Sequence, residues 1–154
     1  SVGGKIAMAT FGPYAGTKFA LEAVSAALRR ELAPLGVRVV VVEPGGVRTE
    51  MGDRGIATTG RLAEAMSPEH RDRYGPLIQA VMALTAAGTT GGSSAEAAAR
   101  VIAKAVTARK PGTRYTIGRD AALLTRLSRV LPDRMLDRIA AAALRPHYPK
   151  TTTA

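Results

Sequence analysis

The sequence predicts an α/β fold built around a parallel β-sheet, and three observations support this prediction. The segment Val37–Val42 is nearly continuous valine, which is typical of a strand buried on both faces of a parallel sheet. A helical pattern of apolar residues precedes it between residues 14 and 35. A second strand candidate, Arg114–Ile117, follows another helical pattern that starts at Ser93. Because a doubly buried strand needs parallel neighbours and covering helices, we expect the complete sheet to have more strands than this chain supplies.

The composition is that of a globular protein, and it excludes several kinds of site. The 154 residues are 46% hydrophobic and 22% charged, which is sufficient for one domain with its own core. The absence of cysteine excludes disulfides, thiolate catalysis and zinc–thiolate sites. His70 and His147 lie far apart without a carboxylate cluster, so we expect no metal site. No apolar run approaches the roughly 20 residues of a membrane span, and we expect a cytoplasmic protein without membrane contact.

The net charge of +10 raises the question of a nucleic-acid partner. The arginines are scattered from Arg29 to Arg145, and only four tyrosines and two phenylalanines are available to stack on bases. We therefore expect a dispersed, solvated basic surface and no nucleic-acid binding. A basic rim could still attract the phosphates of a dinucleotide.

The first predicted helix covers residues 14–35. Leucine and valine recur on it at spacings of three and four, which predicts one apolar stripe made of Leu21, Val24, Leu28 and Leu32. Its many alanines allow another helix or a sheet to approach closely. Pro34 and Gly36 end the helix.

The segment 49–92 has a mixed pattern. Thr58–Gly60 predicts a turn, and Ser67-Pro68-Glu69 predicts a helix start with proline in the first turn. Gly75-Pro76 is expected to interrupt this helix, which resumes as the apolar segment Leu77–Ala87. Apolar helices here could cover a substrate or could simply pack into the core.

The C-terminal part alternates helix, strand and helix. The capping box Ser93-Ser94-Ala95-Glu96 predicts a helix to about Ala108, with an inward face made of Val101, Ile102, Ala105 and Val106. Pro111-Gly112 turns the chain into the strand Arg114–Ile117. Two amphipathic helices, 121–131 and 133–144, follow on either side of Pro132, and residues 146–154 are expected to form a frayed tail. The helical pair either packs on the domain or a partner subunit, or touches a membrane and admits a lipophilic substrate.

One pair of residues carries a chemical signal. Tyr14 and Lys18 lie four residues apart at the start of the first helix, so they share one helical face. A lysine ammonium beside a phenol favours the phenolate, so the tyrosine can act as a general acid or base. Such a pair alone also occurs on ordinary solvated helices. Here Ser1 precedes Tyr14 by thirteen residues, and Pro44-Gly45-Gly46-Val47-Arg48-Thr49 follows the valine-rich strand.

Together these features resemble the second half of the short-chain dehydrogenase/reductase family. The resemblance rests on Ser1, on Tyr14–Lys18 with the helix that follows, on the valine strand and on Pro44-Gly45-x-x-x-Thr49, and it extends more loosely to Tyr115–Gly118. It implies the C-terminal part of a Rossmann-like, doubly wound parallel sheet of the α/β class. The helical lid would be residues 49–92 and the C-terminal helices residues 119–145, within one domain over residues 1–154.

The resemblance also implies the site. Tyr14 would be the general acid/base, Lys18 would assist it and bind the nicotinamide ribose, and Ser1 would hold the substrate oxygen. Residues contacting NAD or NADP would be Tyr14, Lys18, Pro44, Gly45, Gly46, Val47 and Thr49. The glycine-rich turn that cradles the dinucleotide pyrophosphate in this family has no counterpart before Tyr14. We therefore expect the chain to be the C-terminal part of a longer protein, and inactive by itself.

Two functional hypotheses follow from the sequence. The first is an NAD(P)-dependent oxidoreductase that interconverts an alcohol and a carbonyl on a small molecule, which would be lipophilic if the lid helices enclose it. The second is a non-catalytic remnant in which the helix at 14–35 serves as an oligomerisation surface. Because that helix commonly pairs across subunits in the family, we expect a homo-oligomer in either case.

Overall fold

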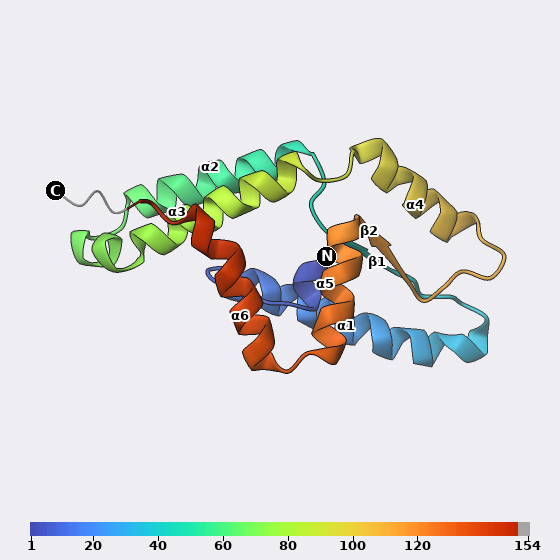
Figure 1. Cartoon of the computed structure of the whole chain (residues 1–154). Helices are drawn as coiled ribbons and strands as arrows, with labels where there is room; N and C mark the ends of the chain where they lie inside the picture. Colours follow the sequence, from blue (N-terminus) through green and yellow to red (C-terminus); the bar gives the residue numbers. More distant parts are fainter. Residues whose placement is uncertain (151–154) are drawn as a thin grey trace.

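The computed structural model describes residues 1–150. Two parallel strands lie near the middle of the molecule, and helices surround them (Figure 1). The strands are β1 (Val41–Pro44) and β2 (Arg114–Ile117), paired in register from Val41 opposite Arg114 to Pro44 opposite Ile117. This arrangement of a parallel strand pair with crossover helices is a partial Rossmann-like α/β fold, as the sequence predicts.

The strand predicted at Val37–Val42 is shorter and less buried than expected. Only Val41 and Val42 belong to β1, which continues through Glu43 to Pro44. Val37 is 50% exposed. The reason is that β1 has one paired neighbour among the described residues, so the valines that precede it meet no second strand. The second strand, in contrast, has the predicted bounds.

The helix that carries Tyr14 is α1 (Gly12–Leu32), followed by a 3-10 turn, η2 (Ala33–Leu35). It begins two residues earlier than predicted because Pro13 fits the first turn, where its missing N–H is not needed. Gly36 ends it in the left-handed conformation, with a φ of 75°. The predicted apolar stripe faces outward rather than into a core, since Leu21, Val24 and Leu28 are all exposed.

Residues 50–90 form an antiparallel helical hairpin that extends away from the strands (Figure 1). It consists of α2 (Glu50–Glu64) and α3 (Pro68–Thr90). Ser67 caps α3 by accepting the N–H of His70, as predicted. The turn predicted at Thr58–Gly60 is wrong, because these residues lie within α2.

The break predicted at Gly75-Pro76 is also wrong, since α3 continues through it. A proline inside a helix removes one backbone hydrogen bond, but tertiary packing of the following turns can outweigh that loss. Those turns hold Ala80 and Val81, which are 0% and 4% exposed. They form a small core with Leu144 of α6, and partly buried Phe11, Leu77 and Leu84 pack against it.

The C-terminal helices are α4 (Ala95–Thr107), α5 (Arg119–Val130) and α6 (Asp133–Leu144), with a final 3-10 turn, η3 (Arg145–His147). The bounds of the three α-helices lie close to the predicted ones. The tail predicted to fray from residue 146 instead begins within η3, which packs against α3, and its last four residues lie outside the described part of the chain. The N-cap of α4 is Ser94, which accepts the N–H of Ala97, so the cap lies one residue later than the predicted Ser93. On α4 the predicted inward residue Ala105 is buried, whereas Ile102 and Val106 are exposed because only one side of this helix contacts β2.

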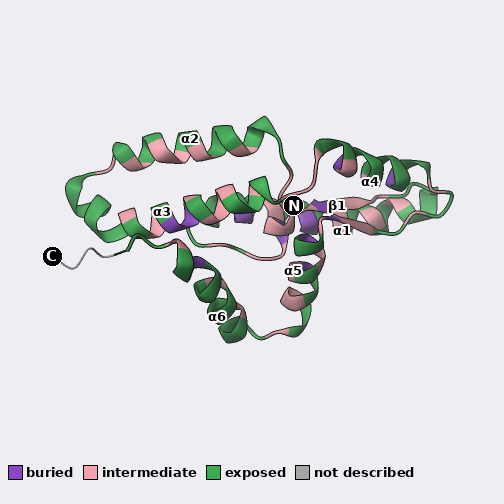
Figure 2. Ribbon diagram, turned by 45° about the horizontal axis from the view of Figure 1, so that its top comes forward, coloured by how far each residue is buried: buried purple, intermediate pink, exposed green. Residues whose placement is uncertain are grey.

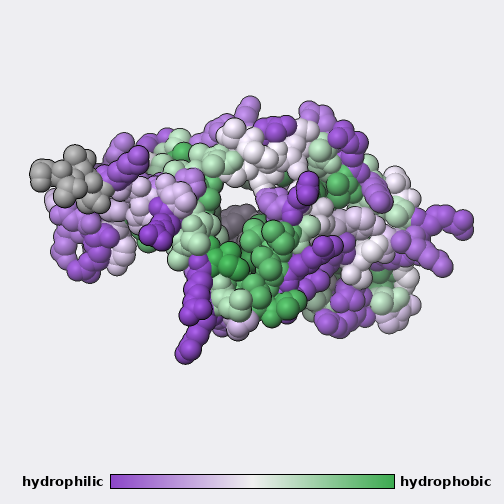
Figure 3. Space-filling model, viewed as in Figure 1, coloured by the Kyte–Doolittle hydropathy of each residue, from purple (hydrophilic) through white to green (hydrophobic). Residues whose placement is uncertain are grey.

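Burial is concentrated along one side of α3 and around the strands, while α2 has no buried residue (Figure 2). Exposed apolar side chains on the last two helices include Leu123 and Met135. Hydrophobic surface gathers between α5 and α6 on the face seen in Figure 3. Both helices nevertheless pack on the rest of the chain, α5 against β2 and α6 against α3. Within residues 1–150, no helix is long and apolar enough to cross a membrane.

Candidate active site

The candidate site is built on one face of α1. Tyr14 and Lys18 lie one turn apart, and Glu22 follows one turn later. Ala15, the residue after Tyr14, is only 3% exposed, so the first turn of α1 is packed against the rest of the protein. The Tyr14 side chain, in contrast, is 45% exposed. The phenol is therefore held on a rigid element but remains open to a ligand.

The Ser1 segment folds onto this face. Residues Val2–Gly4 form a short 3-10 turn, η1, whose N-cap is Ser1: its Oγ accepts the Gly3 N–H at 3.1 Å. The Tyr14 hydroxyl donates to the same Oγ at 3.3 Å. This distance is long for a bond between two hydroxyls, so a small displacement of either group would make room for a third oxygen between them.

Two glycines allow the Ser1 segment to approach α1. A Cβ at Gly3 would lie 3.0 Å from Cε1 of Tyr14. A Cβ at Gly4 would lie 2.9 Å from Cγ of Glu22 and 3.0 Å from the carbonyl oxygen of Lys18. Because such contacts are closer than van der Waals packing permits, a larger residue at Gly4 would push the segment off the helix.

The ammonium of Lys18 lies over the Tyr14 ring, with Nζ 5.4 Å from the ring centroid, within the range of a cation–π contact. Lys18 forms no ion pair with any residue in the described part of the chain. Phe11 packs edge-on against Tyr14, with ring centroids 6.0 Å apart. Phe11 in turn contacts the core of α3 and α6, so the tyrosine is supported on its inner side.

A cluster of four charged side chains lies behind the row. Lys5 Nζ is 2.8 Å from Glu22 Oε2 and 3.7 Å from Glu43 Oε1. Arg114 NH1 pairs with both carboxylates and lies 2.5 Å from Glu43 Oε1. The cluster therefore joins the Ser1 segment, α1, β1 and β2. Glu43 is 1% exposed, and its Oε2 has no hydrogen-bond partner among the described residues.

The cluster holds two cations and two carboxylates, and the pKa shifts of Glu22 and Arg114 follow from their pairing. Burial alone would raise the pKa of Glu22, but hydrogen bonds from Lys5 and Arg114 outweigh burial, and this pKa lies below its ordinary value of 4.5. Burial opposes the charged form of Arg114 as well, yet its bonds to Glu22 and Glu43 raise the pKa of Arg114. The pairing of Glu22 with Arg114 thus favours the charged form of both groups.

The loop Pro44–Thr49 begins at the carboxyl end of β1, where open α/β sheets bind their ligands. It is fixed at several points. Gly46 donates its N–H to Asp120 Oδ2 at 3.2 Å, and its carbonyl accepts the Ser93 N–H at 2.9 Å. A Cβ at Gly46 would overlap the backbone carbonyl of Gly88, so this position requires glycine, whereas a Cβ at Gly45 would displace the Asp120 carboxylate.

Two polar groups of this loop have no hydrogen-bond partner among the described residues. Val47 forms a parallel bridge with Ser93 that uses the Gly46 carbonyl and the Arg48 N–H, so the N–H of Val47 itself faces the other side. It has no partner within residues 1–150. Thr49 occupies the N-cap of α2, yet its side chain makes no capping bond. A backbone N–H and a threonine hydroxyl are thus left to bind a ligand.

The structure brings Ser1, Tyr14 and Lys18 together. Pro44, Gly45, Gly46, Val47 and Thr49 lie in the loop after β1, and η1 contacts both β1 and α5. Among the described residues, no hydrogen bond or ion pair links this loop directly to Tyr14 or Lys18. The candidate site therefore has two parts on neighbouring elements: the side chains of Ser1, Tyr14 and Lys18, and the loop after β1.

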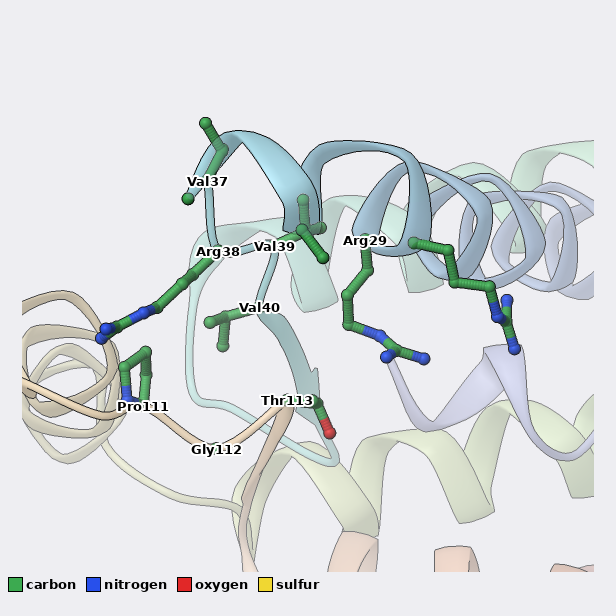
Figure 4. A pocket seen from close by; sticks show the side chains of 11 residues that line it. Arg29, Val37, Arg38, Val39, Val40, Pro111, Gly112 and Thr113 are labelled. Carbon is green, nitrogen blue, oxygen red and sulfur yellow. The ribbon is translucent and has the colours of Figure 1, made fainter.

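A well-defined cavity lies elsewhere. It has a volume of about 520 Å³ and is lined by the end of α1, by residues 36–40 and by residues 111–113. It is at the amino ends of the strands, opposite the loop after β1, and the guanidinium groups of Arg29 and Arg38 lie at its edge (Figure 4). None of the predicted site residues lines it. The chemistry of Tyr14 argues for the other end of the strands, because an arginine-rimmed hollow alone holds no acid/base group.

The sequence prediction missed five polar residues that support the site: Lys5, Glu22, Glu43, Arg114 and Asp120. Glu22 could have been found, because it continues the spacing of Tyr14 and Lys18 by four more residues. Glu43 is the single acidic residue in a run of apolar strand formers, which is itself a sign of a buried partner. Lys5, Arg114 and Asp120 carry no local signal, because their partners lie far away in the sequence.

Comparisons with known proteins agree with this arrangement. A family model described as short chain dehydrogenase matches residues 1–59. The chain is 32% identical to an NADPH-dependent 3-dehydrocapnine reductase of Ornithobacterium rhinotracheale over 90% of this chain and 47% of that protein. It is 36% identical to retinol dehydrogenase 5 of Mus musculus, again over 90% of this chain and 45% of that protein. The chain thus spans about half the length of the curated relatives it matches.

A solved structure is also similar. The crystal structure of a short-chain dehydrogenase from Streptomyces avermitilis matches with a TM-score of 0.57 and 26% identity, covering 94% of this chain and 47% of that one. The strand pair and its surrounding helices therefore correspond to about half of that short-chain dehydrogenase structure.

Proposed function

Because this chain belongs to the short-chain dehydrogenase/reductase family, we propose that the protein containing it is an NAD(P)-dependent oxidoreductase that interconverts an alcohol and a carbonyl. The observation that carries the proposal is the 3.3 Å contact between the Tyr14 and Ser1 hydroxyls beside the Lys18 ammonium. This is the group of side chains that a reaction at a carbonyl oxygen requires, with a proton donor, a second hydroxyl and a nearby positive charge.

The residues present are suited to the nicotinamide end of the cofactor. Lys18, which has no carboxylate partner in the described chain, would bind the ribose hydroxyls. The unpaired Val47 N–H and the Thr49 hydroxyl, which caps nothing, would bind the carboxamide. Pro44, Gly45 and Gly46 would shape the loop around it. The cofactor, NAD or NADP, supplies or accepts the hydride.

Proton transfer would fall to Tyr14. In reduction, its hydroxyl gives a proton to the carbonyl oxygen as the carbonyl carbon receives the hydride, and the product is an alcohol. In oxidation, the phenolate takes the alcohol proton as the hydride leaves the carbon. Ser1 would donate a hydrogen bond to the same oxygen, and the Lys18 ammonium would stabilise the phenolate.

The α2–α3 hairpin would serve as the substrate lid. Both of its ends are attached at one place, because α2 starts directly after the loop and the residue after Gly92 bridges Val47. A cavity of about 310 Å³ between the two helices is lined in part by Met66, Ile78 and Met82. These apolar side chains support a lipophilic alcohol or carbonyl as substrate, in line with the relative named retinol dehydrogenase 5.

The test uses the complete natural protein, with whatever sequence precedes Ser1, and follows cofactor absorbance with a panel of alcohols and carbonyls. Tyr14→Phe is expected to lower kcat by about 10²- to 10⁴-fold, the range for a lost general acid/base, with cofactor binding retained. Tyr74→Phe is the matched control, because Tyr74 is equally exposed (44%) but lies on α3. Equal turnover in Tyr14→Phe and Tyr74→Phe would refute the proposal.

A second candidate is a non-catalytic remnant that acts as an oligomerisation module. The outward apolar row on α1 favours it: Leu21 is 55% exposed and Val24 is 61% exposed, more than a solvated helix needs. This candidate predicts a homo-oligomer that binds no nicotinamide cofactor even at millimolar concentration. The oxidoreductase predicts both assembly and cofactor binding. A cytoplasmic location and the absence of a nucleic-acid partner stay predictions.

A further inference from the structure

We propose that Lys5 is a positioning residue for the Ser1–Tyr14 pair: its ammonium ties the Ser1 segment to Glu22 of α1 and thereby sets the distance between the two hydroxyls. The inference rests on the proposed function, because it concerns how that site is held in place. Lys5 itself would touch neither substrate nor cofactor.

The first step is that the Ser1 segment moves as a unit. Its backbone is closed by hydrogen bonds from Gly4 N to the Ser1 carbonyl at 3.0 Å and from Lys5 N to the Val2 carbonyl at 2.9 Å. The Ser1 side chain is fixed inside the same turn by the Gly3 N–H. A shift at Lys5 is therefore transmitted to Ser1 Oγ, four residues away.

The second step is that Lys5 is attached to a firm anchor. Its partner Glu22 is 9% exposed, lies in the middle of α1 on the Tyr14 face and also pairs with Arg114 of β2. Arg114 and Lys5 both reach the buried Glu43 of β1. Ionic contacts of this kind, partly removed from water, constrain geometry more than exposed pairs do.

The third step is that no other contact between the segment and α1 can replace this one. The Ser1 ammonium also lies 3.5 Å from the Val42 carbonyl oxygen, but that contact leads to β1. The remaining link to α1 is the close approach at Gly4, which is steric and sets only a minimum distance. The hydrogen bond from Tyr14 to Ser1 is itself long at 3.3 Å and weak. The Lys5–Glu22 bond, at 2.8 Å, is thus the attractive contact that draws the segment down onto the helix.

Lys5→Met isolates this role. Methionine keeps an aliphatic stem of similar length, and Arg114 still pairs with both Glu22 and Glu43 in the variant. The Arg114 pairs that join α1 to the strands are therefore retained, and the contact that is lost is the one that holds the Ser1 segment on α1. Lys5→Arg, which keeps the positive charge, is the conservative variant that should rescue activity. Lys110→Met is the matched control, because Lys110 is exposed and forms no ion pair within residues 1–150.

The experiment is a double-mutant cycle on kcat in the complete protein, with Lys5→Met, Ser1→Ala and both together. We expect Lys5→Met to lower kcat by about ten- to a hundredfold, since a misplacement of about 1 Å can cost that much, with the KM for cofactor within about twofold. In the Ser1→Ala background, Lys5→Met should change kcat by less than about twofold, because Ser1 is then absent. Lys5→Gln, which keeps a polar donor, replaces Lys5→Met if the methionine variant does not fold.

The outcomes separate the inference from the proposed function. An equal loss of kcat in both backgrounds, with Tyr14→Phe inactive, would mean that Lys5 acts independently of Ser1, and the positioning role would be wrong. Unchanged kcat in Lys5→Met would overturn it equally. Full turnover in Tyr14→Phe would remove the proposed function itself, and the inference with it.

Discussion

Replacing Gly4 with alanine gives a direct prediction from the packing of the Ser1 segment. The added Cβ would lie 2.9 Å from Glu22 Cγ and 3.0 Å from the Lys18 carbonyl oxygen, whereas ordinary contacts between carbon atoms are about 3.5–4.0 Å. Neither neighbour can yield easily. The Lys18 carbonyl belongs to the helix backbone, and the Glu22 side chain is held by Lys5 and Arg114.

The segment must therefore move away from α1 by about half an ångström or more, the difference between the contact formed and an ordinary one. Overpacking of this kind costs about 1–3 kcal/mol in the free energy of unfolding. The Ser1–Tyr14 contact, already 3.3 Å, would lengthen beyond hydrogen-bonding distance. We expect kcat to fall by about tenfold or more for the same geometric reason.

The assay is urea unfolding together with steady-state kinetics on the complete protein. Gly55→Ala is the matched control: Gly55 lies inside α2, and a Cβ there meets nothing within 4 Å. It should stabilise the protein by about 0.5–1 kcal/mol through the higher helix propensity of alanine. If Gly4→Ala were as stable and as active as Gly55→Ala, the packing of the Ser1 segment on α1 described above would be incorrect.

Two further predictions concern the supports of the site. Asp120→Ala removes the acceptor of the Gly46 N–H and should raise the KM for cofactor by several-fold while kcat changes little. Asp120→Asn keeps an oxygen acceptor and should retain most of the affinity for cofactor. Equal KM values in both variants and the parent would contradict this role of Asp120. Because the pKa of Glu22 is lowered in the folded state, its contribution to stability is complete above about pH 4.5, its unfolded value, and is lost as the pH falls through the folded value. Urea unfolding of Glu22→Gln should therefore show a deficit in the free energy of unfolding of about 3–5 kcal/mol at neutral pH, the range for breaking a buried pair. This deficit should shrink below about pH 4.5; a deficit independent of pH would exclude the ionic explanation.

The parts of the fold that the sequence predicts well are those with local signals. Strand Arg114–Ile117 and helix Asp133–Leu144 have the predicted bounds, because turn residues and a proline precede them. The helix that carries Tyr14 was predicted from its apolar spacing, and its C-terminal end from Pro34 and Gly36. In each case neighbouring residues alone determine the outcome.

The errors arise where distant contacts decide. The helix α3 passes through Gly75-Pro76 because Ala80 and Val81 are packed against Leu144, more than sixty residues later. The valines before β1 and the leucines of α1 are exposed, although their patterns predict burial, because burial depends on partners that a periodic pattern cannot identify. The ionic cluster behind Tyr14 combines residues from four separate elements, and only Glu22 follows a local spacing.

The central claim is that Ser1, Tyr14 and Lys18 form one cofactor-dependent site with the loop after β1. It is tested most directly by a crystal structure of the complete protein with bound nicotinamide cofactor. We predict that Lys18 Nζ lies within hydrogen-bonding distance of a ribose hydroxyl, that the carboxamide contacts the Val47 N–H or the Thr49 hydroxyl, and that Tyr14 faces the nicotinamide ring. A cofactor bound away from Tyr14 and Lys18, or no cofactor at saturating concentration, would contradict the account.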